Sequence, residues 1–578
     1  MKKIVKYAAV AALAMVSFVS CDLLDNKPYD TYTKDNYFSS KSNLDLFVNY
    51  FYSEFTGYGN GGGYGDFYFN TLNDDQAKTG MTPWTFEQVP ASASAWNSPY
   101  NQIRRCNLLI EYTPTVPGLS EADINNYVGI GRLFRAWHHY NLVRNFGDCY
   151  LIDHVVDPGE TDIVYGKRTD RDVVMDFVLE DLKFACANIS QMPNSRVEIN
   201  KYVAAAMMAE ITLYEASFCK YRSAADGQKA ADPARAEKFY RECCTACEEI
   251  IKSGKFSLTP KYADVYKSLN LAGNPEMILY KHYAYPSLAH SVIDYTCGST
   301  QVSGMSKSCF NSYLSKDGEL MTYGDDHGEL IDGKPSMANQ IAARDPRLAV
   351  HVDNLLQYKG NGVIRYEGND AAAKNAAAST SSTGYGVAKF DTDQLDREHR
   401  QEVGKGDTDA PIFWYAVILL NYAEAKAELG EFTKEVQAIT LDALRARAGN
   451  VWGFDYSFHD PMNDAGVSDL IWEIRRERRV ELMYDNNDRY WCLIRWHQLH
   501  KLDTQDYPDQ AKGAWIAGFV DDLSKCDGAT YPFVDADGYI DCHNGGADRK
   551  YDPKYYLLPI PSGQRLLNPE IGQNYGWE

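Results

Sequence analysis

Tryptophan and tyrosine side chains beside small polar residues are the features of this sequence with the clearest chemical use. Trp84 and Trp96 lie in a stretch rich in Ser and Pro, residues 82–99, and residues 58–65 are both glycine-rich and aromatic. The 578-residue chain holds 42 Tyr and 10 Trp. Flat rings with a polar edge suit wet, weakly apolar ligands such as sugars, but the same rings also fill cores and interfaces.

No residue pattern singles out a catalytic site. The sequence has no G-x-S-x-G, no H-E-x-x-H and no phosphate-binding loop. Hydrolysis of a glycosidic bond needs two carboxylates about 5 to 10 Å apart, and 79 acidic residues offer many pairs without distinguishing one. We therefore predict that the protein is not an enzyme and has no catalytic residues.

Metal and cofactor motifs are incomplete. Cys244-x2-Cys247 resembles half of a zinc site, but no second pair at similar spacing follows it. Asp535-x-Asp537-Gly538 has the start of a calcium loop without its remaining ligands. We predict no cofactor and no metal ligand, with a structural calcium ion at Asp535 as the less favoured alternative.

The N-terminus has the pattern of an export signal. Lys2, Lys3 and Lys6 precede an apolar stretch, residues 7–19, that is too short to span a bilayer. It ends in a small residue before Cys21, as in lipoprotein signals, so we predict that Cys21 becomes an acylated N-terminus. The alternative is that Cys21 is an ordinary residue after a conventional cleavage site.

Charge and cysteine content narrow the ligand and the compartment. The net charge is -21, and it becomes -24 without residues 1–20, which disfavours nucleic acid and other polyanions as ligands. Twelve cysteines follow Cys21, and an exported chain favours their pairing. Cys297 with Cys309, or Cys526 with Cys542, are candidate disulfides, but spacing does not decide the pairing.

Helical periodicity dominates two blocks of the chain. The first block contains predicted helices at residues 122–146, 171–189, 201–219 and 234–252. In the second, residues 411–429 begin with Pro and end before Gly430, and predicted helices at 436–449, 469–484 and 488–500 follow. Eight helices in antiparallel pairs indicate a solenoid of about four helix-turn-helix repeats.

The segments around these blocks are irregular. Residues 274–406 are loop-rich and include a low-complexity run at 371–383, and residues 503–578 form an irregular tail. Long irregular segments on a rigid scaffold often hold binding sites. We divide the chain into a signal (1–20), a lipidated tether (21–40), an N-terminal helical region (41–273), a loop-rich insert (274–408), C-terminal helices (409–502) and the tail.

Several ordered motifs resemble the SusD/RagB family of outer-membrane glycan-binding lipoproteins. They are Cys21-Asp-Leu-Leu-Asp; Trp96-x3-Tyr100-x2-Ile103-x2-Cys106-Asn107; Arg132-x2-Arg135-Ala136 leading to Phe146-Gly147-Asp148; Arg344-Asp345-Pro346-Arg347; Leu420-Asn421-Tyr422-Ala423-Glu424-Ala425; Ile474-Arg475-Arg476-Glu477-Arg478-Arg479-x-Glu481-Leu482; and Leu558-Pro559-Ile560-Pro561 with Gln573-Asn574-x-Gly576-Trp577. Each motif is weak alone, but their order and spacing are specific.

The resemblance implies a mainly α fold, with four tetratricopeptide-like helix pairs as scaffold and a loop-rich, mixed subdomain that holds the ligand. It also implies binding without catalysis. Such a lipoprotein captures an oligosaccharide or polysaccharide outside the outer membrane and acts as the lid of a SusC-type TonB-dependent transporter. The negative net charge favours a neutral oligosaccharide as the ligand. A protein-binding adhesin or assembly lipoprotein on the same scaffold, or a lipid-anchored glycosidase, are the alternatives.

Residues on loops are the best candidates for a glycan site, since a sugar needs an open ring face and planar polar side chains. Trp84 is the leading platform, with a place in the core as its alternative. The other candidates are Asp66, Asp74, Asp75, Trp96, Asn101, Tyr283, Tyr285, Tyr295, Cys297, Tyr313, Tyr323, Arg365 and Tyr385. For each, a turn, cap or packing role is the alternative. The arginine-rich helix around Ile474 and the Arg344–Arg347 motif are interpreted as buried ion-pair networks.

Overall fold

The protein is mainly helical and has only short strands. The computed structural model describes residues 38–65, 67, 71–191, 195–297, 303–321, 330–331, 334–335, 337–353, 355–357, 363–365, 381–450, 452–485, 488–520, 522–529, 531–544, 546 and 548–578. The predicted mainly α fold is confirmed. In this part of the chain no helix combines the length and the apolar character that a membrane crossing requires.

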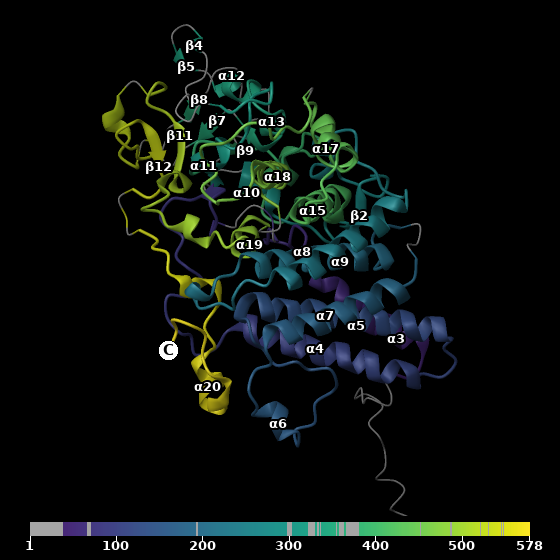
Figure 1. Cartoon of the computed structure of the whole chain (residues 1–578). Helices are drawn as coiled ribbons and strands as arrows, with labels where there is room; N and C mark the ends of the chain where they lie inside the picture. The colour runs from purple at the N-terminus through teal and green to yellow at the C-terminus, as the bar shows by residue number, and fades with distance from the viewer. Residues whose placement is uncertain are drawn as a thin grey trace, which may run out of the picture.

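Long helices lie side by side in the lower half of the molecule (Figure 1). They are α4 (Ser94–Tyr112), α5 (Glu121–Phe146), α7 (Arg171–Asn188), α8 (Lys201–Tyr221) and α9 (Pro233–Lys252), preceded by the shorter α3 (Lys41–Asn49). The closest packing is between α8 and α9, between α5 and α7 and between α4 and α5. The four helices predicted for the first block are confirmed to within two residues at each end.

Local chemistry explains where these helices begin. Ser120 and Asp123 form a capping box at the start of α5. Asn200 accepts hydrogen bonds from two backbone N–H groups of the first turn of α8. Asp232 caps α9, and Pro233 occupies its first turn. Helix α8 is apolar on most of its circumference and is buried on nearly every side.

The C-terminal helices pack above the first block. They are α15 (Tyr415–Glu428), α16 (Lys434–Ile439), α17 (Leu441–Ala448), α18 (Asp469–Glu481) and α19 (Asp488–Arg495). The predicted helix at 436–449 is divided because Thr440 leaves the helical conformation, with φ -115° and ψ -91°. It ends as expected at Gly449, where φ is 91°.

The predicted helical start at Pro411 is wrong. Residues Ala410–Trp414 form strand β10, which pairs antiparallel with β2 (Met277–Lys281). Ile412, Phe413 and Trp414 favour an extended chain, and Pro is tolerated in a two-stranded ribbon, where each strand has a free edge. Strand β10 thus fixes the direction in which α15 enters the helical block.

The upper part of the molecule is built from short elements (Figure 1). The strand pairs are β1 (Gln76–Ala77) with β3 (Gly304–Met305), β4 (Leu330–Ile331) with β5 (Lys334–Pro335), β6 (Val352–Asp353) with β9 (Gly386–Val387), β7 (Leu355–Gln357) with β8 (Val363–Arg365), and β11 (Lys512–Trp515) with β12 (Tyr539–Asp541). The short helices of this part are α10 (Val292–Cys297), α11 (Lys307–Phe310), α12 (Met337–Ala342), α13 (Leu348–His351) and α14 (Arg397–Gln401). Two other short helices, α6 (Thr161–Val164) and α20 (Ser562–Leu567), lie at the lower end of the molecule (Figure 1).

Two hydrophobic cores meet at α15. One core gathers the faces of α4, α5, α7, α8 and α9, and the other lies among the loop-rich segments and α18. Ile418, Tyr422 and Ala425 of α15 belong to the first core, whereas Leu419, Leu420 and Ala423 belong to the second. Helix α15 therefore joins the two halves, and its neighbours form the space described below.

The arginine-rich helix α18 takes part in a buried ion-pair network, as predicted. Arg347 of the Arg344–Arg347 motif contacts Asp345, Glu477 and Glu481, and Arg445 contacts Glu477 at 2.8 Å. These side chains are buried, so their mutual pairing offsets the cost of removing charge from water.

The two candidate disulfides are not formed. Cys309, Cys526 and Cys542 are free, and the Cys309 thiol lies 3.3 Å from the sulfur of Met483. Cys244 and Cys247 lie in the core face of α9, as expected if they are packing residues. Burial raises the pKa of the Cys244 thiol to about 12, so it stays protonated.

Candidate functional site

A cavity of about 610 Å³ lies where the N-terminal and C-terminal helices meet. Its walls come from α5, α8, α15, α18, α19, β10 and the segment around residues 54–67. Thr56 and Tyr64 line it and are exposed to solvent, so the cavity opens beside them. We call this space the cleft.

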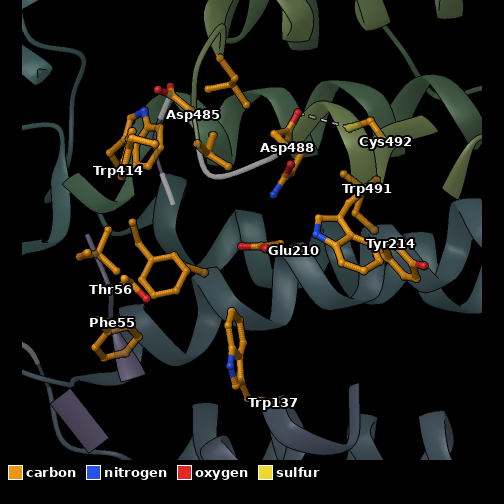
Figure 2. A pocket seen from close by; sticks show the side chains of 18 of the residues that line it. Phe55, Thr56, Trp137, Glu210, Tyr214, Trp414, Asp485, Asp488, Trp491 and Cys492 are labelled. Carbon is orange, nitrogen blue, oxygen red and sulfur yellow. Dashed lines mark hydrogen bonds between the residues drawn. The ribbon is translucent and has the colours of Figure 1, made fainter. Parts of the chain in front are cut away.

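Aromatic rings form much of the cleft wall (Figure 2). Trp137 on α5 and Trp491 on α19 are half-buried, which leaves part of each ring accessible from the cleft. Tyr214, Phe413 and Trp414 complete the wall and are more deeply buried. Flat rings of this kind can stack on the C–H faces of a pyranose.

Glu210 on α8 is the polar side chain at the centre of the cleft. Figure 2 shows it between Trp137 and Trp491, with its carboxylate directed into the open space. Among the described residues it has no hydrogen bond and no ion pair within 4.0 Å. Burial raises the pKa of Glu210, and the nearby Asp488 raises it further, while the charges of Arg144, Arg478 and Arg495 partly oppose this shift.

Two further acidic residues of the cleft, Asp485 and Asp488, have partners. Asp485 accepts hydrogen bonds from Lys389 at 2.7 Å and from Tyr266 at 2.6 Å. Burial still raises the pKa of Asp485 to about 6. Asp488 lies 3.4 Å from Arg478 and accepts from the Cys492 thiol at 3.3 Å. These contacts hold the polar residues of α18 and α19 in fixed positions.

Glu424 on α15 holds together the helices that form one wall of the cleft. It receives hydrogen bonds from Arg495, from Arg478 at 3.2 Å and from the Trp496 indole at 2.8 Å. Burial acts to raise the pKa of Glu424, but the two guanidinium groups lower it to about 2. A carboxylate on α15 therefore connects α18 to the end of α19, next to the cleft.

Several polar atoms of the wall are unsatisfied. Within the described chain, Arg144 Nε, Tyr214 Oη, Trp414 Nε1 and Asn421 Nδ2 are buried without a hydrogen-bond partner. Leaving such groups unpaired costs about 1 to 3 kcal/mol each. The wall is thus unlike a satisfied apolar core, and its chemistry suits a ligand with both ring faces and hydroxyl groups.

The predicted tryptophan platforms lie elsewhere and are buried. Trp84 is 6% exposed, stacks on Tyr555 with ring centroids 4.2 Å apart, and donates its indole N–H to the Lys550 carbonyl. Trp96 is 2% exposed and packs edge-on against Phe146 inside the first core. Since neither ring offers an open face, the structure does not support them as platforms, and the core alternative holds for both.

Asp74 and Asp75 are also occupied by internal contacts. Asp74 is 4% exposed and makes two hydrogen bonds to Arg489, at 2.6 and 2.7 Å, while Asp75 bonds to Arg479 at 2.5 Å. Asp74 lines a second pocket of about 300 Å³. The arginines lower its pKa against the opposing effect of burial, so Asp74 is a structural ion pair and not a free acceptor.

The other predicted residues do not converge on one surface. Tyr385 is 1% exposed and stacks on Phe310, and Tyr283 and Tyr313 are buried. Tyr295 packs edge-on against Tyr64 at 5.4 Å, which places it next to the mouth of the cleft. Asn101 is exposed on α4, and Tyr285 is exposed too. Cys297 is the last residue of α10 and Arg365 the last residue of β8, but the structure does not describe their side chains. Three other candidates lie outside the described residues: Cys21, Asp66 and Tyr323.

Sequence reasoning missed Trp137, Glu210 and Trp491, because all three lie on helices that were interpreted as scaffold. One signal was available for Glu210: it is the only charged residue between Tyr202 and Tyr214, a run that is otherwise apolar apart from Thr212. A lone charge inside a buried helix either pairs or faces a cavity. No comparable signal distinguishes Trp137 from the other rings.

One cluster of described residues has side chains that could bind a metal ion, but neighbouring arginines already neutralise its negative charge. Ligand atoms of Asp172, Glu215 and Cys219 lie within 4.8 Å of one another. Arg171 and Arg235 contact Glu215, at 2.6 and 3.2 Å, so the negative charge is already compensated. Similarly, Asp535, the first residue of the predicted calcium loop, lies 2.8 Å from Lys512. Ion pairs within the protein therefore account for the acidic residues at both places.

Fold and cleft together define a helical scaffold protein with an aromatic-lined cavity. The profile of the SusD family matches residues 280–577, and a second profile, described as starch-binding associating with outer membrane, matches residues 22–213. The chain belongs to the SusD family, as its motifs indicated.

Relatives extend over most of the chain at low identity. SusD-like protein P2 of Formosa agariphila is 23% identical over 86% of this chain and 90% of its own length. A crystal structure of a SusD-like carbohydrate binding protein from Bacteroides fragilis matches 93% of this chain and 100% of that chain, with 18% identity and a TM-score of 0.70. Surface glycan-binding protein A from Bacteroides fluxus matches 93% of this chain and 100% of that chain, with 15% identity and a TM-score of 0.58.

Proposed function

We propose that this protein binds an oligosaccharide in the cleft and releases it chemically unchanged. The observation that carries the proposal is the pair of half-buried tryptophans, Trp137 and Trp491, on either side of the unpaired Glu210. A volume of about 610 Å³ falls within the range of small-molecule sites. Family membership and the names of its carbohydrate-binding relatives support the same ligand class.

Recognition of the sugar combines stacking on aromatic rings with hydrogen bonding to a carboxylate. In this proposal sugar rings lie against Trp137 and Trp491, which removes apolar C–H surface from water. Glu210 accepts hydrogen bonds from hydroxyl groups, and such charge-assisted bonds are among the stronger ones. Neither stacking nor hydrogen bonding requires a bond of the sugar to break.

The proposed location is the outside of the outer membrane, with Cys21 as the lipid anchor and a SusC-type TonB-dependent transporter as partner. The family description for residues 22–213 supports membrane association. In this proposal the protein acts as the lid of the transporter. Replacement of Cys21 by Ser should move the protein from the membrane fraction to the soluble fraction, and a Cys21→Ser protein that stays with the membrane contradicts the anchor.

Calorimetric titration of the mature chain, from Asp22 onward, against neutral and acidic polysaccharides tests the binding proposal. We expect one class to bind, with unchanged chain length in every mixture. Trp137→Ala and Trp491→Ala should each weaken binding at least about fivefold, the equivalent of about 1 kcal/mol. Trp515→Ala, a half-buried tryptophan on β11 outside the cleft, is the matched control and should bind like the unmodified protein.

Each contrary result points to a different function or site. Loss of binding only in Trp515→Ala would move the site to the loop-rich part of the molecule. Shortened products would indicate a glycosidase. Binding of protein with no binding of any glycan would indicate an adhesin or assembly subunit.

A further inference from the structure

The Glu210 carboxylate has no direct partner among the described residues, although three arginines act on it from a distance. It forms no hydrogen bond and no ion pair there, and its side chain is half-buried between α5, α8 and α19. Burial of an unpaired carboxylate is unfavourable, and the raised pKa of Glu210 reflects this cost. A helix that is otherwise apolar around this position could hold Leu or Met there without that cost.

The cations near Glu210 are engaged with other groups. Arg478 and Arg495 both bond to Glu424. Arg144 lies over the Trp491 ring, 4.1 Å from its centroid, and over the Tyr140 ring at 5.1 Å. Its charge attracts Glu210 across the cleft but forms no ion pair with it within 4.0 Å. Glu210 therefore remains accessible from the cleft, next to the ring of Trp137, over which no described cation lies.

We propose that the cleft selects oligosaccharides that carry a protonated amino group, and that Glu210 is the partner of that group. This inference rests on the proposed function. An ammonium group would donate charge-assisted hydrogen bonds to Glu210 and gain cation–π attraction from Trp137. It would neutralise the buried carboxylate, and the net charge of -21 attracts a cationic ligand. Glycans with carboxylate or sulfate groups would be repelled by the same residue.

Two tetrasaccharides of the same linkage test this selectivity: β-1,4-linked glucosamine tetramer, which carries an amine on each sugar, and cellotetraose, which carries a hydroxyl there. At about pH 6 most of the sugar amines are protonated, because electron-withdrawing neighbours lower an amine's pKa only to about 7.7 in a peptide α-amino group and somewhat further in an amino sugar. Calorimetry should then give a Kd for the glucosamine tetramer at least about tenfold below that for cellotetraose. At about pH 9 the amine is neutral, and the preference should disappear.

Variants assign the preference to Glu210. Glu210→Gln keeps the shape of the side chain and should reduce the ratio of the two Kd values to about one. Glu180→Gln is the matched control, because Glu180 is an exposed carboxylate on α7 outside the cleft and its removal changes net charge equally. It should keep the full preference. If Glu210→Gln does not fold, the Kd ratio of the two sugars, measured on the unmodified protein at both pH values, still tests whether the cleft prefers a protonated amine.

The inference and the proposed function fail in different ways. Equal affinity for both sugars, unchanged in Glu210→Gln, would overturn the selectivity while binding itself stands. A preference for acidic glycans would also overturn it. If neither tetrasaccharide nor any other glycan binds, the inference and the proposed function are both wrong.

Discussion

Burial separates the roles of the tryptophans, which sequence alone treats as equivalent. Trp84 has an indole hydrogen bond and a ring stacked on Tyr555, so it is part of the core. Trp137 and Trp491 keep accessible ring surface in the cleft. Contacts between segments hundreds of residues apart decide which ring is accessible. The Lys550 carbonyl, for example, accepts a hydrogen bond from the Trp84 indole, and no local sequence pattern predicts such a contact.

Trp84→Ala should therefore lower the free energy of unfolding by about 3 to 5 kcal/mol, the usual cost of removing a buried aromatic side chain. Urea denaturation, with the intrinsic fluorescence of the remaining tryptophans as signal, measures this change. Trp137→Ala should cost clearly less, because its ring is half-exposed. A Trp84→Ala protein as stable as the unmodified one would return Trp84 to the list of ligand platforms.

The raised pKa of Glu210 predicts a pH-dependent stability. The folded protein holds this proton more tightly than the unfolded chain, so folding is favoured below the unfolded pKa, and that advantage is lost as pH rises through the folded pKa. Above the folded pKa the full penalty of the half-buried charge applies.

Glu210→Gln removes this penalty and should raise the Tm at neutral pH, and the Tm difference should shrink toward zero in acid. Thermal unfolding at a series of pH values measures it, with Glu180→Gln as the exposed control. A lower Tm at pH 7 would mean that Glu210 has a stabilising partner.

At the scale of elements, most helices could be predicted and their ends less so. Apolar periodicity and caps such as Ser120 and Asp232 locate the first block almost to the residue. The strand at Pro411 could not be predicted in the same way, since Pro also begins helices and only pairing with β2, some 130 residues earlier, makes the segment extended. Tertiary context overrides local preference there.

Glu424 is the element-scale contact that shapes the cleft. Glu424→Ala would leave Arg495 buried without its carboxylate partner and Arg478 with only the ion pair to Asp488 among the described residues. Breaking a buried ion pair by removing one partner costs about 3 to 5 kcal/mol. Denaturant titration should show this loss, together with weaker glycan binding. Glu428→Ala, on the same helix but outside the cleft lining, should weaken stability without moving the residues of α19 that line the cleft. Equal effects on binding would contradict the bracing role.

At the scale of the whole molecule, two cores share α15, and the cleft lies beside that junction. The order of motifs was enough to predict the family and the mainly α fold. The cleft was not predictable, because Trp137, Glu210 and Trp491 come from separate helices whose approach depends on the packing of both cores. A sequence shows that these helices are buried but not where their packing leaves a space.

The most direct test of the account is a crystal structure of the mature protein with the oligosaccharide that binds most tightly in the calorimetric screen. We predict electron density for sugar rings against Trp137 and Trp491, with a polar group of the sugar within hydrogen-bond distance of Glu210. Density on the loop-rich part of the molecule, with the cleft filled only by water, would contradict the central claim.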